Sequence, residues 1–215
     1  MRQIVRDFVE ACVDTLPLRD PVFEFGSLQV PGQEGFADLR PLFADREYVG
    51  ADLREGPGVD RIMDAQKTDL PSDSVGVVLL LDTLEHVEAP REAIGEAHRI
   101  LDSGGVLLLS TVMCFPIHDF PSDYWRFTPA GLRHLLQPFP TSLVGYCGER
   151  DFPHTVLGVG MKGDVAEERI QTLTERFRYW NRPHPEATWK DWLRPAIPPI
   201  VLDVYHKMRS RSGGE

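Results

Sequence analysis

Apolar and polar positions along the chain follow two kinds of period. Helical spacing of apolar residues predicts a leading amphipathic helix over 2–16 and further helices over 34–43, 89–101, 128–136 and 165–180. Near-continuous apolar runs are typical of strands buried on both faces, and they occupy 75–81 and 104–112. Shorter β-rich segments predict five more strands, at 21–26, 47–52, 59–63, 141–149 and 155–163.

Strands alternate with helices through most of this order, which predicts an α/β fold with a mostly parallel sheet. We expect seven strands with helices on both faces. The last two predicted strands are joined by a short loop, so a hairpin would make the last strand antiparallel. We expect residues 1–163 to form one domain with its N-terminal helix, and 164–215 to form a helical, Pro/Trp-rich extension packed on the same domain.

Charge divides the chain in the same place. The net charge is −10, and residues 1–163 hold 14 Lys/Arg against 25 Asp/Glu, whereas 164–215 hold 9 against 8. An acidic body disfavours nucleic-acid and polybasic membrane binding. Three cysteines without a CxxC pair argue for a reducing compartment and against a structural zinc site. The charged N-terminus does not resemble a signal peptide and no apolar run is long enough for a span, so we expect a cytoplasmic protein.

Ligands of open α/β sheets bind beyond the carboxyl ends of the strands, so acidic residues there are candidates. Asp52 ends the second predicted strand, where a carboxylate can hold the two hydroxyls of a ribose; it could equally be a solvated acid in a turn. Asp64 and Ala65 follow the third strand, where they could pair with an adenine edge, or Asp64 could simply cap a helix.

Five pieces in order resemble the class I S-adenosylmethionine-dependent methyltransferases, and most of all the small-molecule branch that contains the ubiquinone/menaquinone-type enzymes. The pieces are Glu24-Phe25-Gly26, Tyr48-Val49-Gly50-Ala51-Asp52, Asp64-Ala65, Leu81-Asp82-Thr83-Leu84-Glu85-His86-Val87 and Leu101-Asp102-Ser103-Gly104-Gly105. The resemblance covers about residues 20–163 and implies a Rossmann-like fold, a methyltransferase activity (EC 2.1.1.-) and S-adenosylmethionine as cofactor.

The resemblance also implies cofactor-binding roles. The methionine moiety would lie against Glu24, Gly26 and Ser27, the ribose against Asp52, the adenine against Leu53, Asp64 and Ala65, and the sulfonium against Asp82, Thr83 and Leu84. His86 would follow on the substrate side, although a histidine bridging strand and helix is an equally good account of it.

The first loop departs from the family pattern, because Leu28 and Val30 stand where glycines usually let the backbone approach the ligand. This places the cofactor's methionine end in question. It also disfavours a nicotinamide dinucleotide, which needs a Gly-rich turn at a helix start.

The segment 118–127 is the candidate acceptor site. We expect His118, Asp119 and Tyr124 to be catalytic, with His118 as the base, and Trp125 and Arg126, together with His86, to bind substrate. A well-packed loop in which Arg126 pairs with an Asp is the alternative. One histidine with Asp119 and Asp123 is an incomplete ligand set, so no metal is predicted.

The function expected is methyl transfer from S-adenosylmethionine to a small-molecule or glycan-like acceptor, at oxygen, nitrogen or carbon. The alternative is a degenerate methyltransferase fold that binds a partner without chemistry, and a dinucleotide-dependent oxidoreductase ranks third. The Trp-rich extension could support a homodimer.

Overall fold

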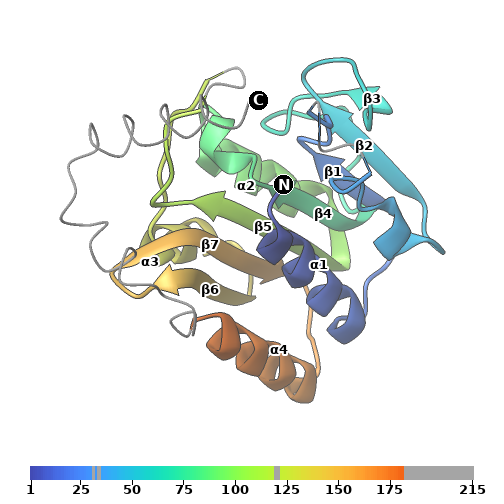
Figure 1. Ribbon diagram of the computed structural model, residues 1–215. Helices are drawn as coiled ribbons and strands as arrows, with labels where there is room; N and C mark the ends of the chain where they lie inside the picture. The colour runs from blue at the N-terminus through green and yellow to red at the C-terminus, as the bar shows by residue number, and fades with distance from the viewer. Residues whose placement is uncertain (31, 33–34, 119–121, 182–215) are drawn as a thin grey trace. The chain divides into compact units, whose positions relative to one another are not determined.

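The computed structural model describes residues 1–30, 32, 35–118 and 122–181, and its centre is a seven-stranded sheet of order β3-β2-β1-β4-β5-β7-β6 (Figure 1). The first five strands are parallel, and β7 runs antiparallel to both β5 and β6. The predicted fold is confirmed, including the hairpin. The strands are Val22–Phe25 (β1), Tyr48–Asp52 (β2), Arg61–Ile62 (β3), Val75–Leu81 (β4), Leu101–Val112 (β5), Thr141–Glu149 (β6) and Phe152–Met161 (β7).

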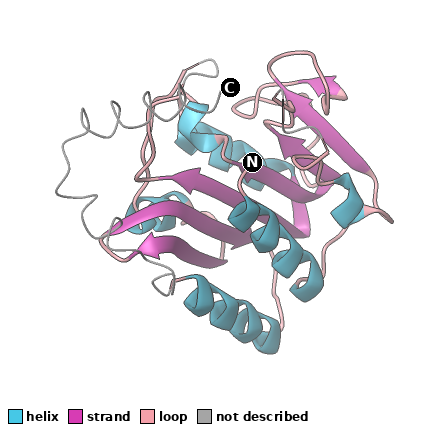
Figure 2. Ribbon diagram, in the orientation of Figure 1, coloured by secondary structure: helices cyan, strands magenta, loops and turns pink. Residues whose placement is uncertain are grey.

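Helices cover both faces of the sheet (Figure 2). One apolar core joins α1 (Gln3–Thr15) and α4 (Glu167–Trp180) to the sheet, and the other joins α2 (Pro90–Ile100) and α3 (Pro129–Leu135) to the opposite face. Successive side chains of β4 alternate between the two cores, since strand side chains point to opposite faces. All of β4 is buried, which explains its unbroken apolar sequence.

The connections are less regular than the helical spacing predicted. The helix expected over 34–43 is wrong in extent, because only the 3-10 helix η1 (Arg40–Phe43) forms in the described part of that segment. A second 3-10 helix, η2 (Leu84–His86), follows β4 directly. No α-helix lies between β1 and β2 or between β3 and β4 among the described residues. The carboxyl ends of β1 and β3 are therefore followed by loops and not directly by α-helices.

The helix α4 packs against α1 and β6 of the same chain. Phe177 and Trp180 lie 6.0 Å from the ring of Phe8 in α1, and α4 also contacts β6. Residues Met1–Arg182 form one compact unit. The predictions for the Pro/Trp-rich stretch 183–215, including the homodimer, fall outside the described residues. Within residues 1–181, apart from the gaps named above, no helix has the length and apolar content needed to cross a bilayer.

Candidate active site

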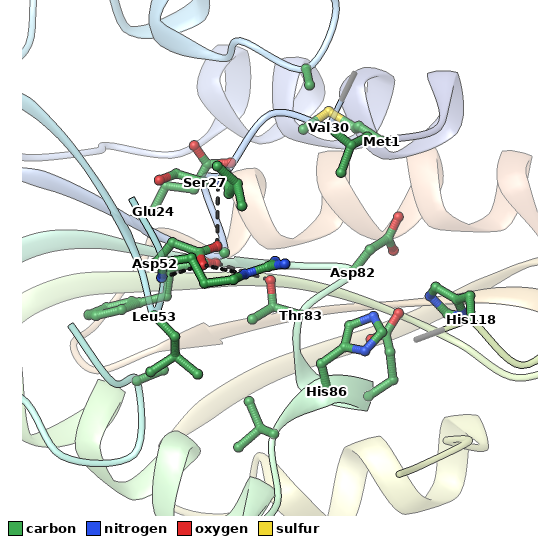
Figure 3. Close-up of a pocket in the computed structure, with 18 of the residues that line it drawn as sticks. Met1, Glu24, Ser27, Val30, Asp52, Leu53, Asp82, Thr83, His86 and His118 are labelled. Carbon is green, nitrogen blue, oxygen red and sulfur yellow. Dashed lines mark hydrogen bonds and ion pairs between the residues drawn. The ribbon is translucent and has the colours of Figure 1, made fainter. Parts of the chain in front are cut away.

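A pocket of about 370 Å³ opens at the carboxyl ends of β1, β2 and β4, where ligands of parallel sheets bind (Figure 3). Two sets of lining residues lie apart in this view. The nucleotide end is formed at the ends of β1, β2 and β3 by Glu24, Gly26, Ser27, Asp52, Leu53, Asp64 and Ala65. The histidine end is formed after β4 and β5 by Glu85, His86 and His118.

Asp52 ends β2 with a carboxylate that is almost fully buried yet borders the pocket. Its Oδ1 accepts the backbone N–H of Arg54 at 3.0 Å, and its Oδ2 accepts that of Leu28 at 3.4 Å. The neighbouring Leu53 is 56% exposed, which leaves its apolar side chain free to cover a planar ring. The strand-end positions inferred from the sequence therefore meet in one place.

Asp64 does not cap a helix, so that alternative is wrong. The described residues that follow it form a turn, in which Asp64 Oδ1 accepts the backbone N–H of Gln66 at 2.8 Å. The side-chain oxygen of Gln66 in turn accepts the backbone N–H of Ala89 at 2.9 Å, just before α2. Gln66 lines the pocket, although no sequence signal distinguished it from other turn residues.

Gly26 and Thr83 lock the loops after β1 and β4 together. Gly26 has φ +84°, and a Cβ there would lie 2.2 Å from Thr83 Oγ1, so only glycine fits. The Thr83 hydroxyl lies 3.0 Å from the carbonyl oxygens of both Phe25 and Leu81. Ser27 also lines the pocket; its Oγ is buried, lies 2.8 Å from where a Cβ on Gly50 would stand, and has no hydrogen-bond partner in the described part of the chain.

The bulky loop residue Leu28 is accommodated by a glycine of the neighbouring loop. Its Cδ1 lies where a Cβ on Gly56 would stand, only 2.4 Å away, and Gln29 N–H bonds the Pro57 carbonyl at 2.9 Å. Leu28 and Val30 still line the pocket, but the cavity stays open beside them. The glycine that allows close packing here is therefore Gly56 in the β2–β3 loop, whereas the usual family pattern has glycines in the β1 loop.

Glu24 is buried in β1 and accepts a hydrogen bond from the Tyr48 hydroxyl at 2.6 Å. Burial raises the pKa of the Glu24 carboxyl to about 7, and the Tyr48 hydrogen bond offsets only part of that rise. A cation bound beside it would favour the ionised form.

Asp82 follows β4 in the left-handed region, with φ +48°, which an Asp tolerates better than most residues. Its Oδ1 accepts hydrogen bonds from Ser110 Oγ at 2.8 Å and from Arg2 Nη2 at 2.7 Å. The Arg2 guanidinium also lies 5.5 Å from the centre of the Phe115 ring. Arg2 is a lining residue that the sequence analysis missed, because an arginine just before an amphipathic helix carries no signal of a distant strand end.

Leu84 is fully buried in the core and is not among the lining residues, whereas Glu85 and His86 beside it are. Glu85 has no exposed surface, and burial together with the Asp82 charge raises the pKa of its carboxyl to about 7. The rings of His86 and His118 meet edge to face, with centroids 4.7 Å apart. The pocket thus joins His118 to the residues after β4.

The rest of the predicted acceptor segment supports the loop. Arg126 forms a paired ion contact with Asp123, and its Nη2 also donates to the Pro116 carbonyl at 3.0 Å. Trp125 Nε1 donates to the Val87 carbonyl at 3.0 Å, and Tyr124 is half-exposed. None of Tyr124, Trp125 and Arg126 borders the pocket, and Asp119 lies outside the described residues.

Residues 44–109, which run from before β2 into β5, match the family model described as "Methyltransferase domain". Over that stretch the chain is similar to this methyltransferase domain, and its seven-stranded sheet has the Rossmann-like fold of class I S-adenosylmethionine-dependent methyltransferases. The methyl donor that this family implies is S-adenosylmethionine, and the activity it implies is that of EC 2.1.1.-. No curated protein matches the chain.

Solved structures share the fold of this methyltransferase domain at low identity. A SAM-dependent methyltransferase from Archaeoglobus fulgidus is 14% identical with a TM-score of 0.59, covering 75% of this chain and 95% of that one. One from Thermotoga maritima is 19% identical with a TM-score of 0.52, covering 74% and 92%. The 1,6-didemethyltoxoflavin-N1-methyltransferase of Burkholderia thailandensis, solved with that substrate and S-adenosylhomocysteine, is 16% identical with a TM-score of 0.55, covering 75% and 78%.

Proposed function

We propose that the methyltransferase domain binds S-adenosylmethionine with its nucleoside at the nucleotide end, and transfers the methyl group to a small-molecule or glycan-like acceptor at the histidine end. The observation that carries the proposal is the buried Asp52 carboxylate, which ends β2 at the wall of the pocket. When bound, the cofactor supplies a methyl group activated by its sulfonium charge. The chain's part is to hold donor and acceptor in line and to exclude water.

The nucleoside is assigned to Asp52, Leu53, Asp64 and Ala65. Backbone N–H groups occupy two of the roughly four acceptor positions of the Asp52 carboxylate, so it can still accept from the two ribose hydroxyls. Leu53 would cover one face of the adenine. Asp64 and the backbone N–H of Ala65 would meet the adenine edge, which presents an amino donor and ring-nitrogen acceptors.

The methionine end is assigned to Glu24, Gly26 and Ser27. The unpaired Ser27 Oγ would find a partner in the ligand's polar groups, which removes the cost of burying a lone hydroxyl. Glu24 can take up the charge of the ligand's ammonium group. Leu28 does not fill this space, since its side chain end lies over Gly56.

The reacting centre is assigned to the stretch after β4. Asp82 and Thr83 border it, with Asp82 oriented by Arg2 and Ser110. Leu84 supports them from the core rather than lining the pocket. The run from 81 to 87 also supports the finer relation to the ubiquinone/menaquinone-type branch, for which a quinol is the natural trial acceptor.

His118 is the proposed proton acceptor for a hydroxyl acceptor, because it lies at the pocket wall next to His86. Arg126 and Asp123 position the loop that carries it. Tyr124 and Trp125 stand on the same loop outside the pocket, where they can contact the exposed part of a larger acceptor such as a glycan.

Calorimetric titration with S-adenosylhomocysteine tests the cofactor assignment on three proteins: wild type, Asp52→Asn, and Asp45→Asn as a matched control at an exposed position outside the pocket. Asp52→Asn should bind about 30-fold more weakly, because it loses charged contacts with the ribose worth about 2 kcal/mol. Asp45→Asn should bind like the wild type. Wild-type protein that shows no binding at millimolar ligand would refute the cofactor site. Equal affinity in all three would refute the ribose assignment alone.

Transfer is tested with S-adenosylmethionine labelled in its methyl group and a panel of quinols, sugars and amines. Labelled product from one class identifies the acceptor. His118→Ala should abolish transfer to a hydroxyl while leaving the affinity for S-adenosylhomocysteine unchanged. Tight cofactor binding without transfer to any acceptor class would favour the non-catalytic alternative.

A further inference from the structure

Three side chains with metal-binding atoms converge at the histidine end of the pocket. One potential ligand atom from each of Glu85, His86 and His118 lies within 4.8 Å of the other two. Glu85 and His86 belong to η2 after β4, and His118 comes from the loop after β5, so the cluster joins two connections that are distant in sequence. Figure 3 shows the two imidazoles side by side next to Asp82.

Both histidines use Nδ1 in contacts with the surrounding loop, which leaves Nε2 available for a ligand. Nδ1 of His86 lies 2.6 Å from the carbonyl oxygen of Ser122, which can only accept, so Nδ1 carries the hydrogen. Nδ1 of His118 likewise lies 3.2 Å from the Pro116 carbonyl and 3.1 Å from an oxygen of Asp123. The neutral form of each ring then keeps a lone pair on Nε2. Metal-bound histidines are held in this way, with the second nitrogen donating to a carbonyl or carboxylate.

Glu85 is the second, independent indication of a cation. Its Oε2 accepts a hydrogen bond from Thr111 Oγ1 at 2.8 Å, but its Oε1 is buried and has no hydrogen-bond partner among the described residues. A buried carboxylate oxygen without a partner is costly, and a metal ion is one of the few groups that would stabilise it. Glu85 lines the pocket, so a cation that enters the pocket can reach it.

The position of His118 is fixed by charge pairing behind it. Asp123 accepts the His118 backbone N–H at 2.9 Å, and Arg126 pairs with the same carboxylate. The side chain of Asp123 has no exposed surface. The loop therefore holds the imidazole in place, as a ligand-supporting residue must.

We propose that Glu85, His86 and His118 bind one divalent transition-metal ion through a carboxylate oxygen and two imidazole nitrogens. Two nitrogens and one oxygen suit Zn²⁺, Co²⁺ or Fe²⁺ more than Mg²⁺, which prefers oxygen alone. Metal–ligand bonds of about 2.1 Å require ligand atoms about 3.0–3.5 Å apart, so the cluster closes by about an ångström on binding. The remaining coordination positions face the pocket, where water or an acceptor oxygen can enter.

The ion would change the role of His118. Its Nε2 lone pair would be used for coordination, so His118 would no longer accept the proton itself. The ion would instead lower the pKa of a bound acceptor hydroxyl, which would release its proton to water. Metal binding itself does not depend on the proposed methyl transfer. The sequence predicted no metal because His118 with Asp119 and Asp123 is an incomplete set; the missing ligands are supplied by η2.

The test is a titration of untagged, chelator-treated full-length protein with Co²⁺, followed by its visible ligand-field absorption, and then displacement by Zn²⁺. Wild type should bind one ion per chain. His118→Ala and Glu85→Gln should each weaken Co²⁺ binding at least 10-fold, since each removes one ligand, while His134→Ala, an exposed histidine outside the pocket, should not. Glu85→Gln keeps the size of the side chain and an oxygen that can accept from Thr111, so we expect this variant to fold. Circular dichroism checks that it does.

No saturable Co²⁺ spectrum in wild type would overturn the proposal. So would an equal loss of Co²⁺ affinity in His134→Ala and His118→Ala, because that pattern indicates binding at surface histidines. Affinity for S-adenosylhomocysteine, measured on the same variants, should not change, which separates failure of the metal site from failure of the cofactor site.

Discussion

The two ends of the pocket are built in different ways. At the nucleotide end, Asp52 ends β2 and Asp64 follows β3, and the parallel sheet alone brings the carboxyl ends of these strands to one edge. At the histidine end, Glu85 and His86 meet His118 only because the loop after β5 folds back over η2, held by Arg126 and Asp123. A site made of strand ends follows from fold topology, whereas a site made of loops depends on the side-chain pairs that hold those loops together.

The largest effect is expected at the joint between the loops after β1 and β4. Gly26→Ala places a methyl group against Thr83 and forces a side-chain residue to φ +84°. We expect the free energy of unfolding to fall by about 4 kcal/mol and cofactor binding to be lost, measured by urea unfolding and calorimetry. Adding Thr83→Ala removes the nearest atom and should recover part of the stability. If the double variant recovers no stability, the loss in Gly26→Ala comes from backbone strain at φ +84° and not from the contact with Thr83.

Glu24→Gln tests the burial of a carboxyl at the nucleotide end through the pH dependence of the unfolding free energy. The Glu24 carboxyl ionises near pH 4.5 when unfolded and near 7 when folded, so the native state binds more protons between these values. The stabilising contribution is present below pH 4.5 and is lost as pH rises through 7, by about 3 kcal/mol.

Glu24→Gln should therefore flatten the fall in unfolding free energy between pH 5 and about 8, measured in the presence of a chelator. Glu85 has a similarly raised pKa, so Glu85→Gln should remove a comparable part of the slope at the histidine end. An unchanged slope in both variants would contradict the burial account of these carboxyls.

Arg126→Ala should damage the histidine end alone. Without the guanidinium, Asp123 loses its ion pair and the loop that carries His118 loosens. We expect Co²⁺ binding to weaken about 10-fold while affinity for S-adenosylhomocysteine stays within about 2-fold. Arg133→Ala, an exposed arginine of α3, is the control. Weakened nucleoside binding in Arg126→Ala would show that the two ends are coupled.

The smallest effect is expected for Leu28→Gly, which restores a glycine of the usual family loop. The Leu28 side chain already lies over Gly56, so removing it should change the affinity for S-adenosylhomocysteine by less than about 3-fold. Gly56→Ala should weaken binding more, because a Cβ there pushes Leu28 toward the pocket. An improvement greater than about 10-fold in Leu28→Gly would mean that Leu28 obstructs the cofactor.

Much of the fold could be predicted because local pattern and burial agree. The apolar run of β4 and the Thr128 cap of α3, whose Oγ1 accepts the Gly131 N–H at 3.0 Å, are local features with local causes. The helix expected over 34–43 failed for the opposite reason: its described residues form turns and bends before the 3-10 helix η1, and the apolar Leu39 and Phe43 are buried in the core without a regular helix.

The candidate site shows the same division. Asp52, Leu53 and Asp64 were found from their positions after strands, and they line the pocket. Arg2 and Gln66 were missed, since their contacts with Asp82 and Ala89 join segments that no periodicity connects.

The sequence by itself determined the order of strands and helices, the acidic residues at strand ends and the resemblance to a methyltransferase, because all of these depend on residues close together in the chain. Only the tertiary structure decided that Gly56 makes room for Leu28, that Tyr124, Trp125 and Arg126 stand outside the pocket, and that Glu85 meets two imidazoles. The physical reason is that distances between side chains on different connections are fixed by packing and hydrogen bonds across the whole domain, and no local pattern encodes them.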